Sequence, residues 1–203
     1  MSAAAVQAAV DAILAGQPVI LPTDTVYGLC ASPHHSEPTE RLYALKGRDP
    51  LQPSSLLAAD LDVLLECLPE LRGRYETIAR ALFPGPFTLI LPNPARRYRW
   101  LTGANQDVIG VRVADLSGPG AQVLAEVGAV VATSANAPGE PDPARLEDVP
   151  AELRSGVAAA LDGGELPGTP STVIDFIGPE PRVVREGPAS GADAIDRARS
   201  ALA

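Results

Sequence analysis

The sequence predicts a fold of the α/β or α+β class, in which helices pack on a sheet. Its 203 residues are enough to bury a substantial core, and the usual size range predicts one domain, residues 1–203. The hydrophobic 46% is mainly Ala, Leu and Val with few aromatic residues, as is typical of helices on a sheet. The 21 prolines and 18 glycines indicate many defined turns.

The first two predicted elements are a helix and a buried strand. Ser2 precedes apolar residues at helical spacing up to Leu14, and Gly16 follows as a stop signal, so the spacing predicts a helix over 2–14. Val19–Pro22 is an apolar run without polar alternation, which indicates a short interior strand.

The rest of the chain alternates between helices and strands. We expect helices over 37–45, 61–68, 71–82, 119–127 and 193–202, and strands over 54–59, 87–92, 107–113, 129–136, 156–164, 171–176 and 182–187. Pro84 and Pro86 end the helix before them, because proline cannot continue it. The Pro-, Asp- and Glu-rich segment 137–148 is expected to be a mobile surface segment and a candidate lid.

Charge and composition exclude several classes of protein. A net charge of −9 opposes general attraction to a nucleic-acid backbone, although a local basic cluster in a cleft is compatible with it. Cys30 and Cys67 lie far apart, so neither a disulfide framework nor a zinc site is expected, and His34 and His35 are interpreted as loop residues. The chain shows no signal peptide or membrane span, so we expect a soluble, cytoplasmic protein.

The stretch VILPTDTVYGLCASP carries the first polar cluster. Thr23, Asp24 and Thr25 place small hydrogen-bonding groups where the strand ends, and Gly28 is expected to allow a backbone turn. A ligand site is one interpretation. The alternative is a loop whose hydroxyl groups bond only their own backbone. For Asp24 we weigh a general-base role against a structural role that caps the turn, and we expect the structural role.

Further polar clusters follow other strands and helices: KGR, GVRV, TSAN, PST and VVREG. Ligands favour the crevice outside strand ends, so convergence of these clusters would build an anion site. Its members would be the cations Lys46, Arg48, Arg112 and Arg185 and the neutral groups Thr23, Thr25, Ser134, Asn136 and Ser171.

Each cluster also has a plainer interpretation. Lys46 and Arg48 around Gly47 suit a polyphosphate, but they also suit a solvated helix end. Arg112 interrupts an apolar run and needs a partner, either a carboxylate ligand or an internal salt bridge. Ser134 and Asn136 share one face of an extended chain, yet an ordinary turn has the same pattern.

Familiar catalytic patterns are missing from the sequence. It has no Walker G-x-x-x-x-G-K-[ST], no dinucleotide G-x-G-x-x-G after a strand and no G-x-S-x-G elbow. Covalent nucleophilic catalysis is therefore not indicated, and any nucleotide site must use another architecture.

Six motifs in order resemble the YrdC-type threonylcarbamoyl-AMP synthase family, in its short single-domain form. They are LPTDTVYGLCASP, LYALKGRDP, LFPGPFTLIL, RWLTGANQDVIGVRV, VVATSANAPGEP and PSTVIDF with RVVREG, and together they cover nearly the whole chain. The resemblance implies an α/β fold with a twisted, mixed parallel and antiparallel sheet and a large concave pocket. It also implies a nucleotidyltransferase that converts L-threonine, bicarbonate and ATP to threonylcarbamoyl-AMP and pyrophosphate, the first step of t6A modification at position 37 of tRNA.

The resemblance also implies roles for individual residues. The family's Lys-x-Arg and Ser-x-Asn signature falls on Lys46, Arg48, Ser134 and Asn136. Threonine would be bound by Thr25, Arg112 and Ser134, with Arg112 on its carboxylate, and ATP by Lys46, Arg48, Val108, Asn136, Ser171 and Arg185. Lys46 and Arg48 would act in catalysis, and Mg²⁺ would be bound mainly by the triphosphate rather than by a protein site.

Two positions depart from the family pattern. Many relatives have Asn-Pro-Leu-Ile-Val-His where this chain has QPSSLLA, so Gln52 replaces the asparagine and Leu57 lies near the histidine position.

The resemblance implies that downstream tRNA threonylcarbamoyltransferase proteins would be partners, whereas the net charge of the chain does not indicate direct contact with tRNA. The alternatives are an inactive YrdC-like paralogue that binds RNA or ribosomes and an enzyme that adenylates carbamoyl phosphate.

Overall fold

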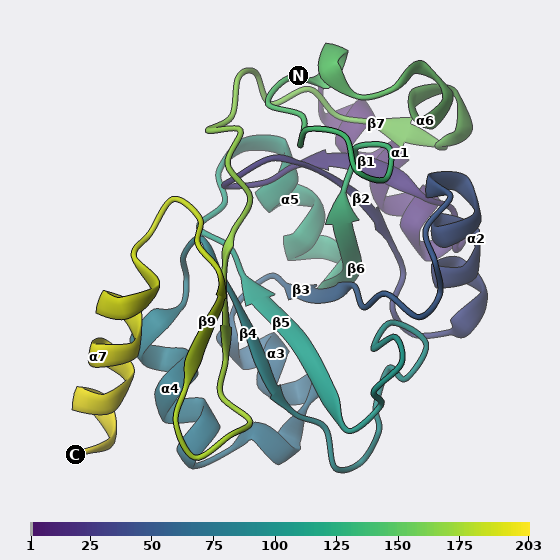
Figure 1. The fold of residues 1–203 in the computed structure, drawn as a ribbon. Coiled ribbons are helices and arrows are strands. Elements are labelled where there is room, and N and C mark those ends of the chain that lie inside the picture. The colour runs from purple at the N-terminus through teal and green to yellow at the C-terminus, as the bar shows by residue number, and fades with distance from the viewer. Residues whose placement is uncertain (1) are drawn as a thin grey trace.

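A computed structural model describes residues 2–203 and shows one nine-stranded sheet with helices on both faces (Figure 1). The strands are β1 (Val19–Pro22), β2 (Tyr27–Ala31), β3 (Ser55–Ala58), β4 (Phe87–Pro92), β5 (Val108–Val113), β6 (Ala129–Ser134), β7 (Ala159–Ala160), β8 (Thr172–Asp175) and β9 (Arg182–Arg185). Their spatial order is β7-β1-β2-β6-β3-β5-β4-β8-β9. The sheet therefore brings together strands that are far apart in the sequence.

The sheet is mixed, as the resemblance implies. The pairs β1–β7, β3–β5 and β4–β8 are parallel. The pairs β1–β2, β2–β6, β3–β6, β4–β5 and β8–β9 are antiparallel.

The helices are α1 (Ala3–Leu14), α2 (Ser36–Lys46), α3 (Leu61–Cys67), α4 (Arg74–Leu82), α5 (Gly118–Val127), α6 (Ala151–Gly156) and α7 (Gly191–Leu202). The 3₁₀ turns η1 (Pro69–Leu71) and η2 (Leu146–Asp148) complete the elements. The Ser2 hydroxyl accepts a hydrogen bond from Ala5 N–H, which starts α1 where the sequence predicts it.

Alternation along the strands divides the core into two layers. On one face of β3, Leu56 and Ala58 join the larger cluster with residues of α2, α3, α4 and α7. Leu57 points to the other face and packs in a smaller cluster with residues of α1 and α5. Helices α1 and α5 cover only part of this face of the sheet, at β1, β6 and β7. The rest of the face, over β3, β4, β5 and β8, borders a cavity.

Two local expectations are wrong. Gly28 lies in β2 rather than in a turn, and the turn occupies residues 23–26 instead. Only Ala159 and Ala160 of the expected strand over 156–164 pair with the sheet, because β7 is a short edge strand on β1. The turn η2 forms the end of segment 137–148, and the helix α6 follows that segment. No helix within residues 2–203 is long and apolar enough to cross a membrane.

Candidate functional site

A cavity of about 500 Å³ opens on the uncovered part of the sheet. Its walls come from the turn after β1, from β2 to β6, from the loop before β5, and from β8 and β9. The lining residues are Thr23, Val26, Gly28, Arg48, Leu51, Pro53, Ser54, Ser55, Thr88, Ile90, Thr102, Ala104, Asn105, Val108, Gly110, Arg112, Ala132, Thr133, Ser134, Pro170, Ser171, Val173, Val184 and Arg185. The polar clusters that the sequence places after strands do converge.

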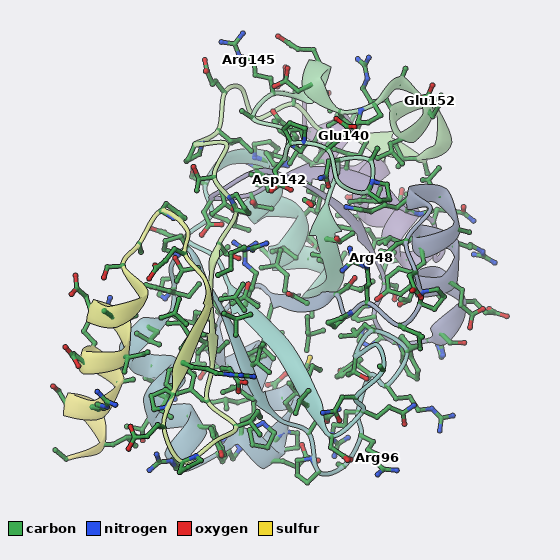
Figure 2. All side chains as sticks on the ribbon, viewed as in Figure 1. Arg48, Arg96, Glu140, Asp142, Arg145 and Glu152 are labelled. Carbon is green, nitrogen blue, oxygen red and sulfur yellow. The ribbon has the colours of Figure 1, made fainter. Side chains whose placement is uncertain are left out.

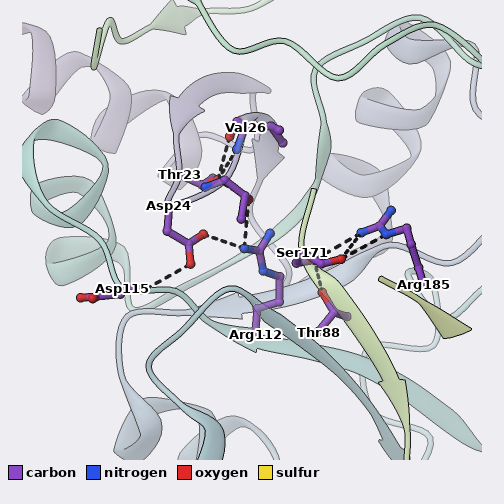
Figure 3. Close-up of polar contacts among 9 residues, drawn as sticks. Thr23, Asp24, Val26, Thr88, Arg112, Asp115, Ser171 and Arg185 are labelled. Carbon is purple, nitrogen blue, oxygen red and sulfur yellow. Dashed lines mark hydrogen bonds and ion pairs between the residues drawn. The ribbon is translucent and has the colours of Figure 1, made fainter. Parts of the chain in front are cut away.

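The turn at 23–26 is closed by Thr23. Its Oγ1 donates to Val26 O at 2.7 Å and accepts from the N–H groups of Thr25 and Val26, each at 3.2 Å (Figure 3). For Thr23 the second interpretation is therefore correct, because its hydroxyl group bonds the backbone of its own turn. The expectation that Asp24 caps the turn is wrong, because its carboxylate turns toward Arg112.

Arg112 on β5 forms a buried ion pair with Asp24. Its Nη2 lies 2.7 Å from Asp24 Oδ1 and 3.3 Å from Thr25 Oγ1. Asp115 N–H donates to the other carboxylate oxygen at 3.4 Å. Burial raises the pKa of Asp24 against the opposing charge of Arg112, and burial lowers the pKa of Arg112 against the opposing charge of Asp24.

The internal salt bridge considered for Arg112 thus exists, and Arg112 also lines the cavity. Thr25 is fully buried behind it and does not reach the cavity lining. The hydroxyl of Thr25 contacts Arg112 and Thr23 instead.

Lys46, the last residue of α2, reaches the TSAN segment after β6. Its Nζ donates to Ser134 O and, at 2.8 Å, to Asn136 Oδ1, while Ser134 Oγ donates to the same Asn136 oxygen at 2.7 Å. Lys46 therefore donates hydrogen bonds to both Ser134 and Asn136. Of these three residues, only Ser134 lines the cavity. Burial lowers the pKa of Lys46 to about 8, with Arg48 adding to the shift and Asp142 opposing it.

Arg48 diverges from Lys46 across Gly47, which ends α2 in the left-handed conformation with φ 66°. Arg48 Nη2 donates to Pro53 O at 2.5 Å, and its guanidinium lies 5.9 Å from the Tyr43 ring centroid. Figure 2 shows Arg48 in the middle of the molecule, where it lines the cavity, and Arg96 at the outer edge. Arg96 is paired with Asp107 outside the cavity lining.

Arg185 and Ser171 form the opposite wall. Arg185 donates from Nε and Nη2 to Ser171 O at 3.1 and 2.8 Å, and Ser171 Oγ lies 2.8 Å from Thr88 Oγ1 (Figure 3). Thr88 and Ser54 also line the cavity, although no motif in the sequence predicts them as site residues. A signal existed for Thr88, because it is the one hydroxyl in the apolar run FTLILP.

Buried polar atoms without a partner concentrate at this cavity. Within residues 2–203, the side-chain atoms of this kind are Thr39 Oγ1, Arg48 Nε, Ser54 Oγ and Arg112 Nε. All except Thr39 belong to lining residues. Leaving such atoms unpaired costs about 1–3 kcal/mol each, so their grouping indicates a place for a polar ligand.

The two departures from the family pattern do not line the cavity. Leu57 is 1% exposed and packs in the cluster with residues of α1 and α5, whereas Gln52 is exposed. Cys30 and Cys67 are free thiols, and burial raises the pKa of Cys30 to about 12. In the described part of the chain, no three His, Cys, Asp or Glu side chains cluster as a metal site would require.

Known proteins resemble this chain in sequence. The family model Sua5_yciO_yrdC, described as "Telomere recombination", matches residues 11–187. A Mycobacterium tuberculosis protein provisionally named threonylcarbamoyl-AMP synthase is 36% identical over 186 residues, which cover 90% of this chain and 83% of that protein.

Solved structures are similar over most of the chain. P. abyssi Sua5 complexed with L-threonine has a TM-score of 0.86 at 29% identity, covering 95% of this chain but only 56% of the P. abyssi chain. E. coli YciO has a TM-score of 0.75 at 28% identity, covering 91% of this chain and 90% of its own. The sequence match, the shared fold and the convergence of the predicted motifs on one cavity show that the chain belongs to the YrdC/Sua5 family.

Proposed function

We propose that this protein synthesises L-threonylcarbamoyl-AMP from L-threonine, bicarbonate and ATP, with release of pyrophosphate. The observation that carries the proposal is the convergence of Arg48, Arg112 and Arg185 with serine and threonine hydroxyls around one cavity. This donor set suits a ligand with several anionic groups. Relatives named threonylcarbamoyl-AMP synthase support the choice of substrates.

In the proposed complex, L-threonine lies beside β5 and the TSAN segment. Arg112 would bind its carboxylate, because a guanidinium donates charge-assisted hydrogen bonds to that group. Ser134 would contact the amino acid directly. Thr25 would contribute by holding Arg112, since its hydroxyl lies behind the cavity wall.

ATP would occupy the rest of the cavity. Arg48 and Arg185 would bind phosphate oxygens, Val108 would offer its backbone to the nucleotide, and Ser171 would lie near the adenylate. Lys46 and Asn136 would act from behind Ser134, which they already contact, with the Lys46 charge directed toward the phosphates. This placement is our proposal.

The chemistry needs positioned anions more than a protein nucleophile. The threonine amine adds to carbon dioxide with loss of a proton, or reacts with bicarbonate with loss of water, to give a carbamate. A carbamate oxygen then attacks the α-phosphorus of ATP, forming the new P–O bond as the bond to pyrophosphate breaks. Lys46 and Arg48 would offset the negative charge that accumulates on the phosphate oxygens.

Mg²⁺ is proposed to enter with ATP. The cavity wall supplies cations and hydroxyl groups rather than a carboxylate cage, which fits a metal held mainly by the triphosphate. When bound, the ion would neutralise part of the phosphate charge. We propose further that the product passes to proteins that transfer the threonylcarbamoyl group to adenosine 37 of tRNA.

The test is pyrophosphate release from ATP and Mg²⁺ with bicarbonate, with and without L-threonine, and with L-serine as a control. We expect release to require L-threonine. Lys46→Ala and Arg112→Ala should abolish turnover and remain folded by circular dichroism. Wild-type rates in either folded variant would contradict the assigned roles, and no threonine dependence in the wild-type protein would favour an inactive, RNA-binding paralogue.

A further inference from the structure

We infer that Asp24 is a positioning residue that holds Arg112 in the orientation needed for an amino-acid carboxylate. The inference rests on the proposed function and deepens it. Asp24 does not line the cavity, whereas Arg112 does. Asp24 therefore acts on a ligand through Arg112 rather than by contact.

The Arg112 guanidinium is held at one end. Its Nη2 is taken by Asp24 Oδ1 at 2.7 Å and by Thr25 Oγ1 at 3.3 Å, and its Nε is buried without a partner. Figure 3 shows that one terminal nitrogen of the Arg112 guanidinium bonds the Asp24 carboxylate. Because the guanidinium is planar, fixing one terminal nitrogen fixes the direction of the remaining donors.

Asp24 is itself held by its surroundings. Its second carboxylate oxygen accepts from Asp115 N–H at 3.4 Å. The turn that presents it is closed by Thr23, and its side chain is only 8% exposed. A carboxylate held in this way keeps the Arg112 guanidinium in one orientation in the ligand-free protein.

This arrangement has a consequence for affinity. A free arginine would lose the rotational freedom of a long side chain on binding, and this loss of conformational entropy lowers affinity. Here that ordering is already present in the folded protein. Removing the Asp24 charge should therefore weaken recognition of the ligand's carboxylate specifically and leave the nucleotide part of the cavity unaffected.

The experiment compares L-threonine with L-threoninamide, in which a neutral amide replaces the carboxylate. Calorimetry gives the Kd of both compounds for the wild-type protein and for Asp24→Asn, and steady-state kinetics gives KM for ATP. We expect Asp24→Asn to weaken threonine binding about tenfold, because the charge-assisted hydrogen bond that orients Arg112 becomes a weaker neutral one, with threoninamide binding and the KM for ATP unchanged within about twofold.

Glu70→Gln is the matched control. It breaks the Glu70–Arg97 ion pair, which has the same 2.7 Å separation outside the cavity lining, and it should change none of these values. Because removing one partner of a buried pair can unfold a protein, Asp24→Glu serves as a second variant. It keeps the charge but displaces it by one methylene, so it should remain folded and lose threonine affinity selectively.

The outcomes separate the inference from the proposed function. Equal weakening of threonine and threoninamide in both Asp24 variants, or no weakening in a folded variant, would overturn the inference while threonine binding by the wild-type protein stands. A wild-type protein that binds no threonine would overturn the proposed function and this inference together.

Discussion

At the scale of single residues, three cavity-lining side chains indicate that the cavity binds a polar ligand: Arg48, Ser54 and Arg112. Each has a buried polar atom without a partner in the cavity wall. Such an atom lowers stability, because it has lost water and gained nothing in return. A ligand that pairs with these atoms recovers that cost as affinity.

Ser54 tests this relation directly. Ser54→Ala removes an unpaired buried hydroxyl, so the ligand-free protein should be as stable as the wild type or more stable by up to about 1 kcal/mol. Affinity for ATP should fall, because a donor in the cavity wall is lost. Thermal unfolding and calorimetry measure the two effects.

Thr39→Val is the matched control for Ser54. Thr39 Oγ1 is also buried and unpaired, but it does not line the cavity. The control should match the stability effect and leave ATP affinity unchanged. Lower stability and unchanged affinity in Ser54→Ala would contradict this role for Ser54.

The pKa of Lys46 predicts a pH dependence. Burial lowers it from 10.5 to about 8, so the ammonium charge is lost as pH rises through about 8. ATP affinity, measured by calorimetry without threonine, should therefore fall between about pH 7 and pH 9. In Lys46→Arg this fall should be absent, since a guanidinium keeps its charge. An affinity that does not change with pH in the wild type would contradict the prediction.

The lowered pKa of Lys46 also makes the free energy of unfolding depend on pH. The unfolded chain binds the Lys46 proton up to about pH 10.5, whereas the folded protein releases it near pH 8. Between these values the unfolded state holds more protons, so the contribution of Lys46 to stability increases with pH. Below pH 8 that contribution is lost, because both states are protonated and the folded state still bears the cost of burying the charge.

The sequence predicts several site residues because their chemistry conflicts with their surroundings. Arg112 stands in an apolar strand, and the Lys46, Ser134 and Asn136 cluster is recognisable in the short motifs KGR and TSAN. The role of Asp24 could not be predicted, since its partner lies 88 positions away in the chain. Only the pairing of strands brings them together.

At the scale of elements, β5 shows how alternation makes the cavity. Ile109, Val111 and Val113 face the larger core cluster, while Gly110 and Arg112 face the opposite side and line the cavity. A Cβ on Gly110 would lie 3.5 Å from Ser55 Oγ and 3.6 Å from Thr88 Cγ2, which is ordinary contact. The backbone at position 110 therefore does not require glycine, and the missing side chain leaves space on the floor of the cavity.

Gly110→Val should consequently separate folding from binding. Valine favours strands, so stability should be equal or higher by up to about 1 kcal/mol. The added methyl groups project into the cavity and should lower ATP affinity by tenfold or more, about 1.4 kcal/mol. Thermal unfolding and calorimetry check both effects, with Gly110→Ala expected to be intermediate. Unimpaired binding by a folded Gly110→Val would show that ligands do not use this floor.

Most elements follow from the sequence because their local patterns are strong. The helix α1 has a cap, a periodic face and a stop signal, and β4 and β5 are clear apolar runs. The errors occur where tertiary contacts decide. Gly28 is typical of a turn by composition, yet it lies in β2 because both β1 and β6 pair with that strand.

At the scale of the whole molecule, the site depends on one uncovered area of the sheet. Helices α1 and α5 pack near β1 and β6, and the remaining area on their face is lined by polar side chains from distant parts of the sequence. The order of strands in the sheet could not be predicted from local patterns, whereas the family resemblance implied the mixed sheet and the pocket. The net charge of −9 coexists with this local cationic lining, so the overall charge does not describe the site.

The most direct measurement is mass spectrometry of the product formed from ATP, Mg²⁺, L-threonine and ¹³C-bicarbonate. We predict a threonylcarbamoyl adenylate that carries one ¹³C atom, accompanied by an equal amount of pyrophosphate, and no such product from Arg112→Ala. Pyrophosphate without the labelled adenylate, or no turnover by the folded wild-type protein, would contradict the proposed synthase function.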